Sequence, residues 1–402
     1  MNLQTSRPLP PGYWTLVAAG EPFRLLFPIG TAIGIIGVLL WPLFVWNFTA
    51  FYPGQIHARI MIEGFLGCFV MGFLGTALPR LLDTSRLTIY ESGVFAAALV
   101  GTTWFHVMGA TLWGDVIFFI TLAAFVVTLV RRFLQRKDTP PPSFILVALG
   151  LCCGLVGTSL LILSQVTTAL VPVWAFVAAR RLLFQGFLLL PVMGVGAFLL
   201  PRFFGMPGRQ NFPESLSLPP GWKPRAFFAS VCGLTVIASF FVEAAGATRI
   251  AMILRAVAVS AYLVREIPVF AMTVGGGSLL LGLRIALLSV PFGYGLLIVF
   301  PDRMFTFLHV VFITGFSLLT FIVGSRVIFG HSGYSRLFAA KLLSVRLLIA
   351  LIFIAMLTRV AADWMPDHRM SHYAHAALAW VCGVIIWAVR ILPGVRKADC
   401  AD

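Results

Sequence analysis

The sequence has few charged residues, and acidic ones are especially scarce. Asp, Glu, Lys and Arg make up 11% of the 402 residues, whereas hydrophobic residues make up 60%. Ordinary soluble domains contain about 25% charged residues, so this composition excludes a soluble enzyme and a disordered chain. The six cysteines show no C-x-x-C spacing, which argues against a disulfide scaffold or a zinc site. What remains is the composition of an integral membrane protein.

Long apolar runs recur along the chain, and most are close to the length of a helix that crosses a bilayer. Twelve such runs are expected, at about residues 25–46, 58–79, 89–113, 115–134, 144–165, 181–201, 226–243, 247–265, 278–300, 303–324, 339–360 and 371–393. They leave short connections and no room for a sizeable soluble domain. We therefore predict an all-α integral membrane protein, with twelve transmembrane helices in a single polytopic domain over residues 1–402.

The basic residues indicate topology. The formal net charge of +15 comes from 29 Lys and Arg against 14 Asp and Glu, and most of the basic residues fall at the termini and in alternate connections. By the positive-inside rule, both termini are expected in the cytoplasm. Because the charge is spread over many short loops, no nucleic-acid partner is expected, and the partner that the composition implies is the lipid bilayer.

Two of the predicted spans resemble each other. EGFLGCFVMGFLGTALPR at 63–80 aligns with QGFLLLPVMGVGAFLLPR at 185–202, with nine of the 18 positions identical, and TGFSLLTFIVGSR at 314–326 is a fainter third copy. These spans are spaced four apart. The spacing predicts three pseudo-repeats of four helices around a pseudo-threefold axis, at about 22–134, 144–265 and 278–393.

Six of the seven histidines are predicted near the outer face. His57 and His309 lie at similar depth on repeat-equivalent spans, so we expect this pair to bind opposite faces of one heme. His106 lies deeper, about 10 Å below the outer end of its span at 1.5 Å per residue, and is a further candidate for the cofactor site. His372 and His375 share one helical face with the spacing of metal ligands. For each of these residues, an interhelical hydrogen bond or an interfacial position is the alternative interpretation.

Polar side chains at membrane depth are expected to be paired or functional. Arg59 and Arg181 occupy equivalent repeat positions near the outer face, where guanidinium groups either neutralise heme propionates or anchor the helix at the interface. Glu63 and its counterpart Gln185 keep one repeat position polar, as a proton carrier or as part of a hydrogen-bond network. Arg255 lies inside a span and is expected to face the protein interior.

Specific segments resemble one family. HARIMIEGF, starting at His57, is followed by GFLGTALPRLL, and together they resemble the NnrS hallmark H-A-H-E-M-x-x-G-F then G-F-L-x-T-A-x-P. PFRLLF at Pro22 and R-x-x-x-G-H-S-G at Arg326 extend the resemblance to the last span. It implies a twelve-span bacterial inner-membrane protein associated with nitric oxide stress and carrying heme and copper. The layout is also similar to that of the heme-copper oxidase catalytic subunit, in which histidines of the second and tenth spans hold the low-spin heme.

The chain departs from the family pattern in its second span. Arg59 stands where the family has its second histidine, and Ile60 stands where it has glutamate. The sixth and seventh spans, which supply copper ligands in the oxidase layout, contain no histidine. These departures argue against copper and leave heme b as the expected cofactor. The resemblance then implies a protein that binds or redox-processes nitric oxide or transfers electrons from a donor or complex partner, with a heme-dependent oxidoreductase as one form.

A second hypothesis belongs to another class. The short loops also fit a non-catalytic or transport subunit of a larger respiratory or photosynthetic membrane complex. The sequence contains no Walker motif, nucleophile elbow, zinc-protease motif or Rossmann fingerprint. ATP hydrolysis, acyl transfer and nicotinamide chemistry are therefore not expected.

Overall fold

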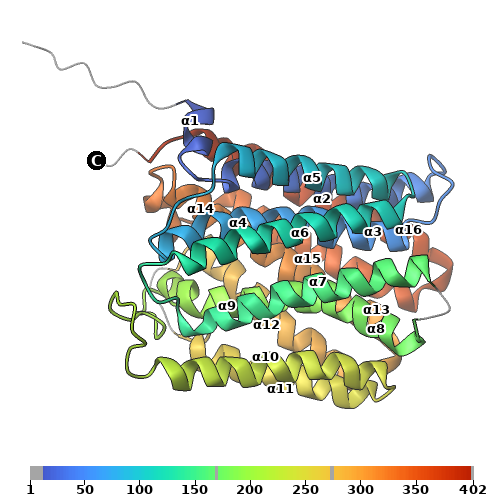
Figure 1. The fold of residues 1–402 in the computed structure, drawn as a ribbon. Helices are drawn as coiled ribbons and strands as arrows, with labels where there is room; N and C mark the ends of the chain where they lie inside the picture. The colour runs from blue at the N-terminus through green and yellow to red at the C-terminus, as the bar shows by residue number, and fades with distance from the viewer. Residues whose placement is uncertain (1–11, 168–170, 272–275, 400–402) are drawn as a thin grey trace, which may run out of the picture.

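A computed structural model describes residues 12–167, 171–271 and 276–399, and the chain in these ranges forms helices and connecting turns without any strand (Figure 1). Ten of its helical segments are long and apolar enough to cross a membrane, which makes the chain a multi-pass membrane protein. The first half consists of α1 (Tyr13–Ala18), α2 (Phe23–Val45), α3 (Gly54–Arg59), η1 (Ile60–Leu66), α4 (Gly67–Leu81), α5 (Ile89–Val107), α6 (Thr111–Leu134), η2 (Pro142–Phe144), α7 (Ile145–Val166), α8 (Val173–Arg181), η3 (Leu182–Gly186), α9 (Phe187–Leu199) and η4 (Leu200–Phe204). The second half consists of α10 (Trp222–Ala244), α11 (Thr248–Glu266), α12 (Ser278–Val299), η5 (Pro301–Arg303), α13 (Met304–His309), η6 (Val310–Ser317), α14 (Leu318–Gly330), η7 (Ser335–Ala339), α15 (Leu343–Ala361), η8 (Ala362–Trp364), η9 (Pro366–His368), α16 (Arg369–Ile391) and η10 (Leu392–Arg396).

Helices α5 and α11 coincide with two of the twelve predicted spans but are not among the ten helices that are long and apolar enough to cross a membrane. Each has 19 residues. Helix α11 contains Arg249, Arg255 and Arg265, and α5 contains Glu91 and His106, so both are more polar than the other spans. The count of twelve transmembrane helices therefore stays a prediction.

The boundary between the third and fourth predicted spans was wrong by several residues. The sequence predicted spans at 89–113 and 115–134, but α5 ends at Val107 and α6 begins at Thr111. Gly109 has a φ of +75°, which glycine adopts without a Cβ clash, and its N–H donates to the His106 carbonyl at 3.0 Å. This turn ends α5 and places Asp115 within α6.

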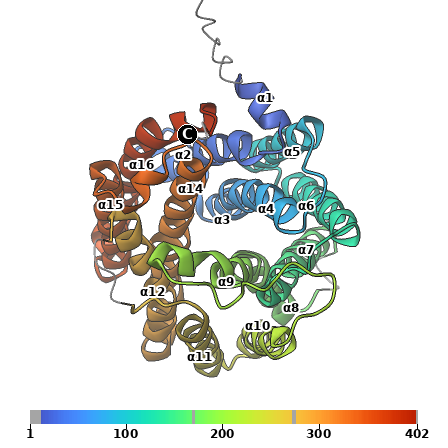
Figure 2. The same ribbon diagram turned by 90° about the vertical axis from the view of Figure 1, so that its left-hand side faces the viewer.

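Within the described residues, nine helices form a closed ring around three inner ones (Figure 2). Around the ring α2, α5, α6, α7, α10, α11, α12, α15 and α16 each contact the next, and α16 contacts α2. The inner helices are the continuous segments 54–81, 173–204 and 301–330, which are also the most buried of the ten candidate spans, at 78%, 83% and 72%. They carry the three predicted repeat motifs, so the arrangement supports a pseudo-threefold layout.

Each inner helix contains a π-helical segment at the same aligned place. These segments are η1, η3 and η6, and they hold the repeat-equivalent polar residues Glu63, Gln185 and Thr314. All three side chains are buried. Because π-helical turns are rare and often mark functional sites, the side chains around these segments are candidate functional residues.

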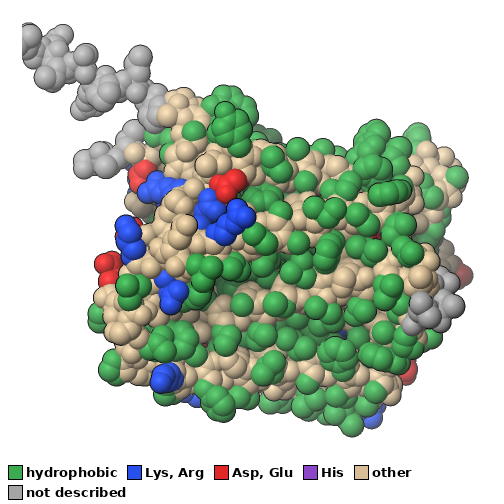
Figure 3. Space-filling model, in the orientation of Figure 1, with side chains coloured by type: hydrophobic (Ala, Val, Ile, Leu, Met, Phe, Trp, Pro, Cys, Tyr) green, Lys and Arg blue, Asp and Glu red, His purple; other side chains and the backbone are tan. Residues whose placement is uncertain are grey.

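The two ends of the described chain lie at one end of the bundle, where α1 contacts η10 (Figure 1). In Figure 3, basic side chains gather at this end, while hydrophobic side chains cover much of the side of the bundle. This asymmetry agrees with the positive-inside expectation for that end, and the cytoplasmic assignment of the termini stays a prediction.

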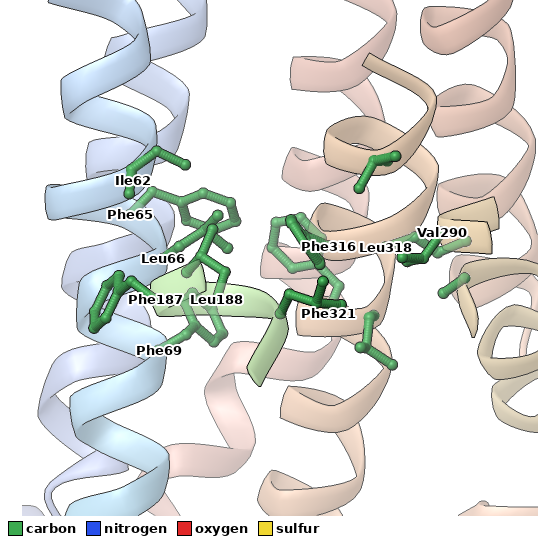
Figure 4. Close-up of a cluster of buried hydrophobic side chains, with 14 of the residues drawn as sticks. Ile62, Phe65, Leu66, Phe69, Phe187, Leu188, Val290, Phe316, Leu318 and Phe321 are labelled. Carbon is green, nitrogen blue, oxygen red and sulfur yellow. The ribbon is translucent and has the colours of Figure 1, made fainter. Parts of the chain in front are cut away.

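Aromatic side chains fill the middle of the bundle. The rings of Phe65 and Phe321 stack with centroids 5.6 Å apart, and Phe321 lies 4.8 Å from Trp387. Figure 4 shows Phe65 and Leu66 on one inner helix facing Phe316 and Phe321 on another. Large aromatic surfaces held at this spacing pack the inner helices against one another.

The cysteines form no disulfide within the described ranges. Cys68, Cys153 and Cys232 are buried, whereas Cys152 and Cys382 are exposed on the outside of the bundle. The sixth, at position 400, lies outside the described residues.

Candidate functional site

A cavity of about 620 Å³ opens at the end of the bundle opposite α1. Its walls come from all three inner helices together with α2, α15 and α16, so it lies where the three predicted repeats meet. Aromatic and aliphatic side chains such as Phe65, Leu66 and Trp380 form the deep part, and charged side chains form the rim. The volume lies within the range of ligand sites, roughly 300–1,000 Å³.

His57 and His309 both line this cavity, from α3 and α13 respectively. Both are half-buried. His57 packs against Trp41 with ring centroids 5.9 Å apart. The structure therefore brings together the two histidines that the sequence predicted as a pair, from helices more than two hundred residues apart in the chain.

Both imidazoles are oriented by backbone carbonyls. The Nδ1 of His57 donates to the Gly37 carbonyl on α2 at 2.9 Å, and the Nδ1 of His309 donates to the Phe305 carbonyl. A carbonyl only accepts, so Nδ1 carries the proton and Nε2 keeps its lone pair. A histidine held in this tautomer is prepared to bind a metal through Nε2.

The rim of the cavity carries an excess of positive charge. It contains five arginines and two aspartates, namely Arg180, Arg181, Arg303, Arg359, Arg369, Asp302 and Asp363. Asp363 pairs with Arg359 at 3.2 Å and with Arg369 at 3.7 Å, while Arg181 pairs with Glu243 at 2.7 Å. Arg180 packs over the rings of Phe176 and Phe184. A ligand with carboxylate groups is complementary to such a rim.

Of the other predicted site residues, Gln185 also lines this cavity, and several others lie away from it. Arg181 lines it, but Arg59 and His106 do not. His372 is half-buried and His375 is exposed; neither lines the cavity, and each Nδ1 donates to the carbonyl four residues earlier, at 3.0 and 2.7 Å.

Arg59 and His106 belong instead to a second buried cluster. Glu63 of η1, His106 of α5 and Asp115 of α6 each offer a ligand atom, and these atoms lie within 4.8 Å of one another. His106 Nε2 is 2.8 Å from Glu63 Oε2 and 3.8 Å from Asp115 Oδ1. The Arg59 guanidinium donates to Asp115 Oδ1 at 2.8 Å and to Oδ2 at 3.2 Å. The cluster joins three helices of the first predicted repeat.

A related cluster lies in the second predicted repeat. The Arg255 guanidinium donates to Gln185 Oε1 at 3.1 Å, to Ser239 Oγ at 2.9 Å and to Glu243 Oε2 at 2.7 Å. The Tyr294 hydroxyl also donates to Gln185 Oε1, at 3.0 Å. The structure thus joins Gln185 and Arg255 in one network, whereas Glu63 belongs to a separate one, and the functional role predicted for these three residues stays a prediction.

Sequence reasoning missed several residues of these sites. Asp115, Glu243, Arg359 and Asp363 were not singled out, although each lies in or at the end of an apolar run. An acidic residue at such a position is rare, and that rarity is the signal that could have found Asp115 and Glu243.

The opposite end of the bundle holds a further cavity and an ion-pair cluster. The cavity, of about 440 Å³, is largely apolar, with Arg202, Arg326 and His331 among its lining residues. Nearby, Glu21 lies just before α2 and receives hydrogen bonds from Arg24, Arg80 and His331. Burial raises the pKa of Glu21, but the hydrogen bonds and charges of His331 and Arg24 outweigh it and bring the pKa to about 2.

The fold and cavity define a class, a multi-pass helical membrane protein with a histidine- and arginine-lined site at one end of a central axis. The model of the family described as NnrS protein matches residues 18–397, nearly the whole chain. The chain therefore belongs to the NnrS family, and this membership indicates a membrane protein of the nitric oxide response. A comparison with curated proteins found no match.

Proposed function

We propose that the chain binds one heme b in the cavity lined by His57 and His309. Through this heme the chain acts in the nitric oxide response, as an electron carrier or as a nitric oxide-binding protein. The observation that carries the proposal is that His57 and His309, from two inner helices, line one cavity with both Nδ1 atoms engaged by carbonyls. Two neutral imidazoles with available Nε2 atoms are a ligand set that heme iron accepts.

The remaining walls of the cavity fit the same group. Phe65, Leu66 and Trp380 offer apolar surface for a porphyrin ring, and the rim arginines offer guanidinium groups for its propionates. Arg180 is a suitable partner because its guanidinium packs on aromatic rings, and no ion pair with a carboxylate is found for it among the described residues. Among the described lining residues, His57 and His309 are the histidines, and the proposal assigns both of them to heme iron and none to copper.

A bound heme supplies one-electron redox chemistry or a coordination position for a diatomic ligand. The number of protein side chains that coordinate the iron determines which of these two functions is available. With both His57 and His309 as ligands, no position is left for nitric oxide, and electron transfer is favoured. With one of them displaced, nitric oxide has a place to bind. The paired, carbonyl-anchored arrangement supports the first alternative, with an electron donor or complex partner as the source of electrons.

Absorption spectra of the detergent-purified chain test the proposal. We expect about one heme iron per chain, with a sharp α band in the dithionite-reduced state that nitric oxide does not perturb. His57→Ala and His309→Ala should each lower heme content or open the site to nitric oxide. His375→Ala is the matched control, because this histidine also donates from Nδ1 to a carbonyl but does not line the cavity.

The outcomes separate the candidate functions. A nitric oxide-induced shift in the unmodified protein would favour a binding role over electron transfer. A colourless preparation that does not take up added hemin, or unchanged spectra in both histidine variants, would reject the heme site and favour a transport or non-catalytic subunit of a larger complex.

The proposal also includes the setting of the site. We place the chain in the bacterial inner membrane with twelve spans in three repeats, both termini in the cytoplasm and the cavity at the periplasmic end. The closed nine-helix ring, the three π-helical segments and the basic end near α1 support this arrangement. Cysteine labelling at exposed positions near each end would test the orientation.

A further inference from the structure

The buried cluster of Glu63, His106 and Asp115, outside the proposed heme cavity, has the composition of a metal site. All three side chains have no exposed surface. They come from η1, α5 and α6, so three helices must pack correctly to assemble them. Burying two carboxylates at membrane depth is costly unless positive charge accompanies them.

The hydrogen bonds of the cluster leave part of it unsatisfied. His106 Nε2 faces both Glu63 Oε2 and Asp115 Oδ1, but a single N–H cannot serve both carboxylates well. Glu63 Oε1 and His106 Nδ1 are buried and have no hydrogen-bond partner within the described ranges. Unpartnered polar atoms of this kind are rare in protein interiors, and two of them belong to this one cluster.

The second repeat shows how the equivalent polar position is compensated by a side chain. There Arg255 places its guanidinium among Gln185, Ser239 and Glu243. In the first repeat, the guanidinium of Arg59 donates its hydrogen bonds to Asp115 and not to Glu63. Among the described residues, Glu63 therefore receives no hydrogen bond from a guanidinium, and its partner in the cluster is the His106 imidazole.

We propose that Glu63, His106 and Asp115 bind one divalent transition-metal ion, with Zn²⁺ as the representative of the class. An ion with bonds of about 2.0–2.1 Å in tetrahedral geometry spaces its ligand atoms about 3.3 Å apart, and the distances of 2.8 and 3.8 Å from His106 Nε2 bracket this value. One imidazole and two carboxylates suit Zn²⁺, Mn²⁺ or Fe²⁺, whereas Cu⁺ prefers sulfur ligands, which this set lacks.

Neighbouring residues complete the site. Arg59 holds Asp115 from one side, and Gln165 donates to Asp115 Oδ2 at 2.6 Å from the other, while accepting from the Thr111 hydroxyl at 2.8 Å. Gln165 is half-buried, so a polar connection runs from the surface to the carboxylate. Gly114 leaves room for the His106 ring, because a Cβ there would lie 2.4 Å from that imidazole.

Metal analysis of purified protein tests this inference. After chelator treatment and equilibration with Zn²⁺, we expect about one tightly held zinc per chain by mass spectrometry, in addition to heme iron. Replacing Zn²⁺ by Co²⁺ should give visible d–d absorption typical of a four-coordinate ion. Glu63→Gln, His106→Gln and Asp115→Asn should each abolish the stoichiometric ion.

Glu266→Gln is the matched control, because Glu266 is also buried but lies in α11 away from the cluster. An unchanged melting temperature and elution volume in detergent show that each variant is folded. Because this control does not use heme, failure of the zinc site and failure of the heme site remain distinguishable. Substoichiometric zinc in the unmodified chain, or zinc retained equally in all three cluster variants, would overturn the proposal and identify the cluster as a proton-sharing network.

Discussion

Arg255 and Glu243 form an ion pair inside the bundle, with 2.7 Å between Nη2 and Oε2 and with both side chains almost completely buried. The two residues lie on neighbouring helices, α10 and α11, and Glu243 also pairs with Arg181 of the cavity rim at 2.7 Å. The pair therefore connects an outer-ring helix to the proposed heme site. In an apolar surrounding, each member depends on the other for the compensation of its charge.

Removal of the Arg255 charge should destabilise the protein strongly. We expect Arg255→Met to lower the free energy of unfolding by about 3–5 kcal/mol, because Glu243 then loses its fully buried partner and keeps only the half-buried Arg181. Arg249→Ala is the control, since Arg249 is exposed on the same helix and should change stability by about 0.5 kcal/mol or less. Thermal unfolding in detergent measures both; equal melting temperatures would contradict the expectation.

Acid should weaken the end of the bundle near α1. The pKa of Glu21 is about 2 in the folded protein and close to 4.5 without these partners, so its contribution to stability is complete above about pH 4.5. This contribution is lost as the pH falls from about 4.5 toward 2. Melting temperatures of the unmodified chain should therefore fall over this range. The fall should be smaller in Glu21→Gln, and parallel curves for the two proteins would show that Glu21 does not contribute.

A methyl group at position 114 should disturb the metal site. In Gly114→Ala the added Cβ meets the His106 ring at 2.4 Å, so the imidazole must move away from Glu63 and Asp115. We expect weaker zinc binding and a lower melting temperature, although Ala is normally the better helix former. Gly101→Ala, at a position with no atom within 4 Å of the added Cβ, should leave zinc binding unchanged. Identical zinc affinity in the two variants would argue against a role for His106.

The rim charge should affect the redox properties of the heme. A cation disfavours the more positive oxidised iron, so removing one at the cavity rim stabilises the oxidised state. Arg180→Gln should therefore lower the midpoint potential by tens of millivolts, as measured by redox titration of the α band. Arg346→Gln, at an exposed position of α15 away from the cavity, serves as the control. A raised or unchanged potential in the Arg180 variant would mean that this guanidinium does not face the heme.

Much of the fold could be predicted from the sequence because apolar length and helix length are directly related in a membrane. The pairing of His57 and His309 was predicted from their equivalent repeat positions and their similar depth in the membrane. Both properties follow from position along the helix and depend little on how the side chains are oriented. The break at Gly109 was missed because the apolar pattern continues through it, and only a left-handed φ shows that the helix stops there.

The cluster of Glu63, His106 and Asp115 could not be predicted from the sequence, for a different reason. His106 and Glu63 are 43 residues apart on different helices, and their contact depends on how η1 and α5 are rotated about their own axes. Hydropathy gives depth but not rotation, so His106 was grouped with the other outer-face histidines. Asp115 was missed because it was predicted as the first residue of its span, where an exposed acidic residue is common. Helix α6 starts earlier than predicted, and this places Asp115 inside the protein.

The π-helical segments have a mechanical consequence for the whole bundle. A residue inserted into an α-helix turns everything beyond it by about 100° about the helix axis. Because η1, η3 and η6 lie at matching heights, the halves of the inner helices above and below them are offset in angular register. The same three helices thereby present one set of faces to the histidine-lined cavity and another set to the apolar cavity at the far end. Each inner helix therefore has two segments, one on either side of its π-helical turn, that face different directions. Deleting one residue from η1 would remove this offset from the first inner helix and turn one of its two segments away from the cavity that it lines.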